Sequence, residues 1–170
     1  MSKEYILSRF REVGVVIEGP FELTSGSVSD FYLDVKKAFG YPDILNAIAD
    51  EISKRLPSST TCIAGSGFGG LMLAPVVASR SGNKLLTVRD DPKKHGTGSL
   101  IEGHVPTERD IVTIVDDVLT TGRSIEKIRD ILEGRGILVN LAFVVVRREI
   151  PITLRIPYSF IFTLKQVFEE

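Results

Sequence analysis

The spacing of apolar residues predicts helices in four segments of the chain. Within two of them, apolar side chains return every three or four positions, which places them along one face of a helix. Gly14 ends the first segment, and Gly134 or Gly136 closes the last. The third segment contains Pro75, which is unfavourable inside a helix. The predicted helices span residues 4–13, 42–56, 71–82 and 122–136.

Short apolar runs between these segments predict strands. Several of the runs are continuously apolar rather than alternating, as expected of strands that are buried on both faces. Strands that alternate with helices form a mainly parallel sheet flanked by helices, so the predicted fold class is α/β. The predicted strands span residues 30–39, 61–64, 84–88, 111–115 and 137–146, and residues 151–170 are expected to add a short edge strand and a final turn of helix.

The bulk composition predicts one globular domain and argues against two kinds of partner. The chain has 170 residues, 43% of them hydrophobic, so we expect a single domain over residues 1–170 with a substantial core. With 21 basic and 22 acidic side chains, the charge gives no reason to expect nucleic acid as a partner. No apolar run approaches the roughly 18 residues that span a bilayer, so no membrane partner is expected. The one cysteine, Cys62, excludes an internal disulfide and fits a reducing compartment, and we expect a cytoplasmic protein.

The stretch "IVTIVDDVLTTGRS" (residues 111–124) carries the strongest chemical signal. Two acids, Asp116 and Asp117, follow a predicted buried strand, and hydroxyl side chains with a glycine follow them. The acids could instead cap the next helix or lie in a solvated loop. However, adjacent carboxylates suit the two hydroxyls of a diol or a hard Mg²⁺ ion, and the turn at a helix start suits a phosphate. Together these features favour a site for ribose 5-phosphate.

Three loops are expected to share one edge of the sheet. Residues 65–70, 89–98 and 116–124 each follow a predicted strand. In parallel sheets, ligands bind beyond the carboxyl ends of the strands. We therefore place the candidate site at that edge.

The chain resembles the type I phosphoribosyltransferases, and within them the orotate phosphoribosyltransferases. "VTIVDDVLTTGRS" is similar to the phosphoribosyl pyrophosphate signature of the larger family. "FELTSGSVSDFYLD" (21–34), "VRDDPKKHGTGSLIEG" (88–103) and "VVVRRE" resemble segments of the orotate enzymes. The resemblance implies the type I fold with a small amino-terminal hood. It also implies transfer of ribose 5-phosphate from 5-phosphoribosyl 1-pyrophosphate (PRPP) to orotate, which gives orotidine 5'-monophosphate and pyrophosphate in UMP biosynthesis.

The same resemblance implies roles for individual residues. The catalytic residues would be Lys93, His95, Asp116 and Asp117. The residues expected to bind PRPP are Arg89, Lys93, His95, Asp116, Asp117, Val118, Leu119, Thr120, Thr121, Gly122, Arg123 and Ser124. Thr120 and Arg148 are expected to contact orotate. Mg²⁺ is expected to bind mainly through the substrate, with Asp116 and Asp117 as candidate ligands. A homodimer is also implied, in which the loop at 89–98 acts across the interface.

Some residues depart from the family pattern and leave alternatives open. Thr24, Gly69 and Asp90 stand where the family often has lysines, so the nucleobase could be one other than orotate. A non-catalytic protein that binds a nucleotide or PRPP is a second alternative. "GSGFGG" (65–70) matches the G-x-G-x-x-G pattern after a strand, and this favours a third alternative, a dinucleotide-binding oxidoreductase module.

Overall fold

A six-stranded sheet forms the centre of the molecule, and its order is β5-β4-β3-β6-β7-β8. The computed structural model describes residues 2–22, 28–89, 91, 99–148 and 152–168. Every neighbouring pair of strands is parallel except β4 and β5, which are antiparallel. The strands of this sheet are β3 (Cys62–Gly65), β4 (Lys84–Val88), β5 (Ile101–Gly103), β6 (Ile111–Leu119), β7 (Leu138–Arg147) and β8 (Tyr158–Thr163).

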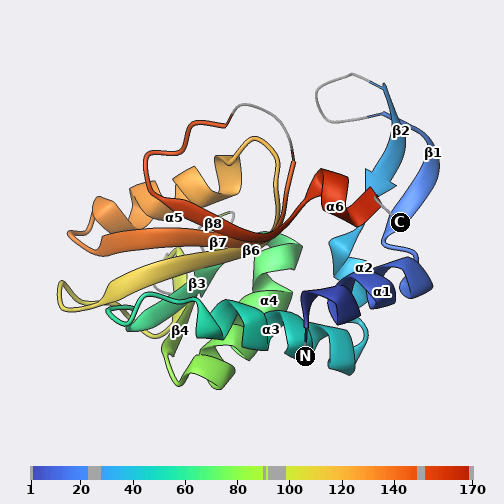
Figure 1. Cartoon of the computed structure of the whole chain (residues 1–170). Helices are drawn as coiled ribbons and strands as arrows, with labels where there is room; N and C mark the ends of the chain where they lie inside the picture. The colour runs from blue at the N-terminus through green and yellow to red at the C-terminus, as the bar shows by residue number, and fades with distance from the viewer. Residues whose placement is uncertain (1, 23–27, 90, 92–98, 149–151, 169–170) are drawn as a thin grey trace.

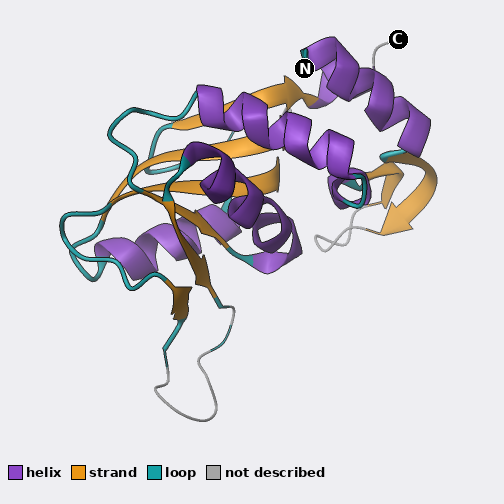
Figure 2. Ribbon diagram, turned by 90° about the horizontal axis from the view of Figure 1, so that it is seen from below, coloured by secondary structure: helices purple, strands orange, loops and turns teal. Residues whose placement is uncertain are grey.

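Helices cover both faces of this sheet, which confirms the predicted α/β class. In Figures 1 and 2, α5 lies on one face, and α1, α3 and α4 lie on the other. No described helix is both long and apolar enough to cross a membrane. The helices are α1 (Lys3–Val13), α2 (Val35–Phe39), α3 (Pro42–Lys54), α4 (Gly67–Ser81), α5 (Arg123–Glu133) and α6 (Leu164–Phe168).

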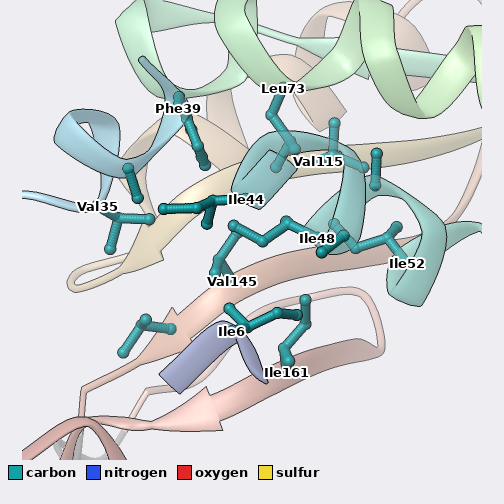
Figure 3. Packing of buried hydrophobic residues seen from close by; sticks show 14 of the residues in the cluster. Ile6, Val35, Phe39, Ile44, Ile48, Ile52, Leu73, Val115, Val145 and Ile161 are labelled. Atoms are coloured by element: carbon teal, nitrogen blue, oxygen red, sulfur yellow. The ribbon is translucent and has the colours of Figure 1, made fainter. Parts of the chain in front are cut away.

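Two apolar cores, one on each side of the sheet, explain why the strands are continuously apolar. Successive side chains of a strand point to opposite faces. In β6, Val115 therefore packs in the core with α1, α3 and α4, whereas Ile114 packs in the core with α5. Both side chains are fully buried. Figure 3 shows part of the first core, in which Ile44 and Ile48 of α3 lie near Val115 and Val145.

A small antiparallel sheet, β1 (Val16–Glu22) with β2 (Val28–Leu33), forms the predicted amino-terminal hood. It lies to the side of the main sheet, near α6 (Figure 1). The rings of Phe31 in β2 and Phe168 in α6 meet edge to face, with their centroids 4.6 Å apart. This contact fixes the hood against the chain that leaves β8.

The structure corrects several predicted boundaries. Residues 30–39 were expected to form one strand, but β2 ends at Leu33 and α2 begins at Val35. The second half is helical because Val35, Ala38 and Phe39 are buried with the i, i+3, i+4 spacing of one helix face. β1 and β5 were not predicted. Helix α4 begins four residues earlier than expected, at Gly67, and accommodates Pro75 in its interior.

Candidate active site

Asp116 is the buried member of the acid pair. Strand β6 continues to Leu119, so both acids belong to the last part of the strand rather than to the loop after it. Asp116 accepts hydrogen bonds from the backbone N–H of Asp117 and from the hydroxyl of Ser124, each at 2.9 Å. Burial and the neighbouring charge of Asp117 raise the pKa of Asp116 to about 7. This carboxyl group can therefore hold a proton near neutral pH.

Asp117 points to the other face of β6 and meets a lysine that the sequence did not suggest. The Nζ atom of Lys36, in α2, lies 3.3 Å from Oδ2 of Asp117 and 3.3 Å from Oδ1 of Asp34. Burial would lower the pKa of Lys36, but Asp117, Tyr32 and Asp34 together raise it above its ordinary value. The ammonium group is therefore charged beside Asp117. Lys36 was missed because it lies 81 residues from Asp117 in sequence, within a segment predicted to be a strand.

Gly69 lets α4 approach Asp117 closely. A Cβ atom at residue 69 would lie 2.3 Å from Oδ1 and 2.4 Å from Cγ of Asp117. Any side chain at this position would therefore displace the carboxylate. This contact gives a physical reason for glycine at residue 69, where the family that the sequence resembles often has a lysine.

The glycines of the turn between β3 and α4 also have a packing role. A Cβ atom at Gly65 would lie 2.6 Å from the carbonyl oxygen of Gly70. The G-x-G-x-x-G pattern thus permits close packing of the strand end against the first turn of the helix. It also leaves backbone N–H groups of that turn near Asp117, where an anion could approach them.

The turn after β6 forms a second anion-binding feature. Gly122 precedes α5 with a φ of 77°, and no side chain caps the helix start. The first backbone N–H groups of α5 are therefore free to bind a phosphate. A Cβ atom at residue 122 would lie 2.4 Å from Cδ2 of Leu154, which would have to shift, and the positive φ angle of residue 122 itself favours glycine.

The other predicted residues of this segment surround the same turn. Val118 donates its backbone N–H to Oδ1 of Asp117 at 2.9 Å, and Leu119 is fully buried beneath the turn. Thr121, Arg123 and Ser124 are exposed, and Thr120 is partly exposed. The turn after the acid pair thus carries exposed hydroxyl groups and a guanidinium group, which suit a phosphorylated diol.

Arg148 lies at the carboxyl end of β7, next to the same turn. Its backbone N–H donates to the carbonyl oxygen of Leu119 at 3.1 Å. Its guanidinium carbon lies 5.7 Å from the centre of the Phe31 ring in the hood. The hood therefore holds this cation by a cation–π contact beside the end of β6, where the guanidinium could bind a carboxylate.

The structure brings only part of the predicted site together. Arg89, at the end of β4, pairs with Glu102 of β5 at 3.6 Å rather than with the acid pair. Lys93, His95 and Asp90 lie outside the described residues. Residues 116–124 and Arg148 form one cluster at the carboxyl edge of the sheet, and Lys36 and Gly69 join it from α2 and α4.

The described residues do not form a metal site of their own. No group of three or more His, Cys, Asp or Glu side chains among them could hold a metal ion. Each carboxylate oxygen already has one partner: the oxygens of Asp116 accept from the N–H of Asp117 and from Ser124, and those of Asp117 contact Lys36 and the N–H of Val118. The carboxylate oxygens still suit Mg²⁺, provided that a ligand supplies most of its coordination.

Comparisons with known proteins identify relatives that cover most of the chain, although no model of a known protein family matches it. The chain is 37% identical over 151 residues to the orotate phosphoribosyltransferase of Thermococcus gammatolerans, which covers 87% of this chain and 79% of the relative. It is 39% identical over 147 residues to the enzyme of the same name from Methanocaldococcus jannaschii, covering 86% and 82%. The crystal structure of orotate phosphoribosyltransferase from Aeropyrum pernix superposes with a TM-score of 0.83 at 30% identity and covers 95% of each chain.

Proposed function

This chain belongs to the orotate phosphoribosyltransferase family, and from that membership we propose its reaction and the roles of its residues. It transfers the ribose 5-phosphate group of PRPP to orotate and gives orotidine 5'-monophosphate and pyrophosphate, a step of pyrimidine biosynthesis. The observation that carries the proposal is the cluster that Asp116 and Asp117 form with the uncapped start of α5. This cluster occurs in a chain that is 37% and 39% identical to two orotate phosphoribosyltransferases. The same membership favours this reaction over the oxidoreductase alternative.

The reaction needs no nucleophilic side chain. A ring nitrogen of orotate forms a bond to C1 of the ribose and loses its proton to solvent. The bond from C1 to the pyrophosphate oxygen breaks, and its electron pair leaves with the pyrophosphate. C1 becomes cationic as the leaving group departs, so catalysis consists of alignment and stabilisation of the leaving anion. In our proposal Asp116 and Asp117 hold the ribose hydroxyls, and residues 120–124 bind the 5-phosphate.

The base and the leaving group require further residues. Arg148 is proposed to bind the orotate carboxylate, because its backbone joins the end of β6 at Leu119 and its guanidinium lies beside Phe31. Thr120 is proposed to contact the base from the turn. Lys93 and His95, with Arg89, are proposed to bind the pyrophosphate from the loop at 89–98.

Mg²⁺ is proposed as the cofactor. The acid pair would help to hold an ion that binds mainly through the substrate, with Asp117 as the more available ligand because the pKa of Asp116 is raised. When bound, the ion would supply Lewis-acid stabilisation to the leaving group. The side chains of this chain would orient the ribose and exclude water around it.

We also propose a homodimer in which the loop at 89–98 acts in the partner's site. An apolar strip on α4 supports this arrangement. Phe68, Leu71 and Met72 share one helix face by their spacing, and all are exposed, Phe68 by 83%. Exposed apolar side chains gathered on one surface indicate an interface. This strip begins within the glycine turn beside Asp117, so a second copy docked there would lie next to the site.

Subunit mixing tests the shared site. Lys93→Ala and Asp117→Asn proteins should each be inactive alone. After the two are unfolded and refolded together, each heterodimer would contain one site with intact acids and an intact loop. Activity should return to about a quarter of that of the wild type, because half of the dimers carry one good site of two. Mixtures that stay inactive while forming dimers would show that each loop serves its own subunit.

The reaction itself is tested by parallel assays with PRPP and Mg²⁺. Orotate, uracil, hypoxanthine and adenine are supplied separately, and nucleotide formation is followed by chromatography. We expect turnover with orotate only. Turnover with another base, and none with orotate, would change the substrate but not the transferase class. No nucleotide with any base, despite PRPP binding, would support the non-catalytic alternative.

A further inference from the structure

Lys36 occupies the side of the acid pair that faces α4. Its side chain is 32% exposed, so a ligand can reach it. An ammonium group has three hydrogen-bond donors, and the partners of Lys36 among the described residues are Asp117 and Asp34. Among the described residues, these two carboxylates leave at least one of the three donors for a ligand.

Helix α2 holds Lys36 in this place before any ligand arrives. Val35 and Ala38 are fully buried and Phe39 nearly so, and they fix the short helix against the core. The next residue, Lys37, faces away and donates to the carbonyl oxygen of Gly14 at 3.2 Å. Two adjacent lysines thus have different surroundings, and only Lys36 meets the acid pair.

The two acids have different neighbours, and this difference orients the sugar. Asp116 is tied to Ser124, in the turn proposed to bind the 5-phosphate. Asp117 is tied to Lys36 and touches the turn that contains Gly69. In ribose, the hydroxyl on C3 is nearer the 5-phosphate and the hydroxyl on C2 is next to C1. In the proposed sugar site, Asp117 would therefore face the C2 hydroxyl, and Lys36 would lie on the side of C1.

We propose that Lys36 binds the pyrophosphoryl group on C1 of PRPP. The inference rests on the proposed function and adds to it a cation that the family resemblance did not indicate. A pyrophosphoryl group carries several negative charges and accepts charge-assisted hydrogen bonds. Lys36 would contact it together with the first N–H groups of α4, a helix start that no side chain caps.

The test compares Lys36→Gln with Lys37→Gln, a neighbour that loses the same charge away from the acids. The Michaelis constants for PRPP and for orotate are measured in Mg²⁺, with the inhibition constant of inorganic pyrophosphate and the melting temperature. For Lys36→Gln, we expect the PRPP Michaelis constant and the pyrophosphate inhibition constant to rise by about tenfold to a hundredfold, as for a lost hydrogen bond to a charged group. The orotate Michaelis constant should stay within about twofold. Lys36→Arg should restore most of the affinity, and Lys37→Gln should resemble the wild type.

A purely structural role for Lys36 predicts a different result. The melting temperature of Lys36→Gln would fall, while its inhibition by pyrophosphate would stay unchanged, and that outcome overturns the proposal. If Lys36→Gln does not fold, the same measurements on Lys36→Met, which keeps the apolar stem of the side chain, test the proposal instead. Calorimetric titration of wild type and variant with pyrophosphate and Mg²⁺ gives the answer even without turnover. A wild type that makes no nucleotide would contradict the proposed function, whereas an active wild type whose pyrophosphate affinity does not depend on Lys36 would contradict only this inference.

Discussion

The hydroxyl of Ser124 donates to Oδ2 of Asp116 at 2.9 Å and joins the start of α5 to the buried acid of β6. The hydrogen bond favours the ionised carboxylate, but burial and the charge of Asp117 oppose it more strongly. The result is an acid whose pKa is raised to about 7 at the centre of the proposed sugar site. Such a group makes the stability of the empty protein depend on pH.

The first prediction concerns this dependence. In the unfolded chain the pKa of an aspartate is about 3.9. Because the folded pKa of Asp116 is higher, its contribution to stability is fully present below about pH 4 and is lost as the pH rises through about 7. In Asp116→Asn, the neutral amide mimics the protonated carboxyl group, so the variant does not lose stability as the pH rises. At pH 8 the variant should exceed the wild type in free energy of unfolding by about 2–4 kcal/mol, and the two should converge near pH 4.

Urea unfolding from pH 4 to 8, without divalent cations, measures this effect. Asp43→Asn is a control in which the pKa shift has the opposite sign, because hydrogen bonds from Tyr5 and Arg9 lower the pKa of Asp43. This control should be less stable than the wild type at neutral pH and approach it as the pH falls. A constant difference between Asp116→Asn and the wild type at every pH would contradict the raised pKa.

The second prediction separates function from stability at the acid pair. The double variant Asp116→Asn, Asp117→Asn should remain folded, because neither carboxylate holds apolar elements together. It should lose PRPP affinity by at least about a hundredfold, since two hydrogen bonds to charged groups are removed. Circular dichroism and calorimetric titration with PRPP and Mg²⁺ check both parts. Retained affinity in a protein with a much lower melting temperature would indicate a structural pair.

The layered architecture could be predicted because it depends on local patterns. The spacing of Ile44, Ile48 and Ile52 specifies one buried helix face, and the continuous apolar run before Asp116 specifies a strand buried on both sides. The fold class was predicted correctly from these patterns. The family and the transferase activity were predicted correctly from the resemblance of residues 21–34, 88–103 and 112–124 to known enzymes. The place of residues 116–124 at the carboxyl edge followed from the parallel sheet.

The contacts between distant segments could not be predicted. The pairing of Lys36 with Asp117 depends on how α2 packs against the core, and no local pattern encodes it. Residues 30–39 were misread because the alternation of β2 passes into the helical spacing of α2 without a glycine or proline between them. From the sequence, Gly69 was only a position where orotate phosphoribosyltransferases often have a lysine. The structure explains the glycine, because a Cβ atom at residue 69 would overlap the Asp117 carboxylate. The roles assigned to Lys93 and His95 stay predictions.

The third prediction tests those two residues. Lys93→Ala and His95→Ala should each lower the turnover number at least tenfold and leave the melting temperature nearly unchanged, if their contacts form only when the loop closes over the substrate. His104→Ala is the contrasting variant. His104 contacts the buried Asp110 at 2.9 Å, so its loss should lower the melting temperature and leave turnover largely intact. Unchanged turnover in both loop variants would show that the loop is a solvated charged segment.

The fourth prediction concerns specificity for the base. Arg148→Lys keeps a positive charge but loses the planar pair of donors that fits a carboxylate. The orotate Michaelis constant should rise by about tenfold or more, while that for PRPP stays nearly constant. Phe31→Leu, which removes the ring beside the guanidinium, should have a smaller effect in the same direction. Equal rises in both Michaelis constants for Arg148→Lys would place this residue outside the base site.

The last prediction uses the contact between Gly69 and Asp117 as a double-mutant cycle. A methyl group at residue 69 would overlap the Asp117 carboxylate, because its carbon would lie 2.3 Å from Oδ1. In the wild-type background, Gly69→Ala should therefore lower stability and weaken PRPP binding, since the carboxylate must turn away. In an Asp117→Ala background the overlap is gone. The same substitution should then stabilise the protein by up to about 1 kcal/mol, because alanine favours a helix over glycine.

Thermal unfolding of the four proteins gives the coupling energy between residues 69 and 117. Gly40→Ala, where a Cβ atom meets only the carbonyl oxygen of Lys37 at 3.4 Å, shows the effect of an added methyl group away from the site. A change of sign between the two backgrounds would establish that residue 69 is glycine to make room for Asp117. An equal effect in both would mean that the helix start itself, and not the acid, requires glycine.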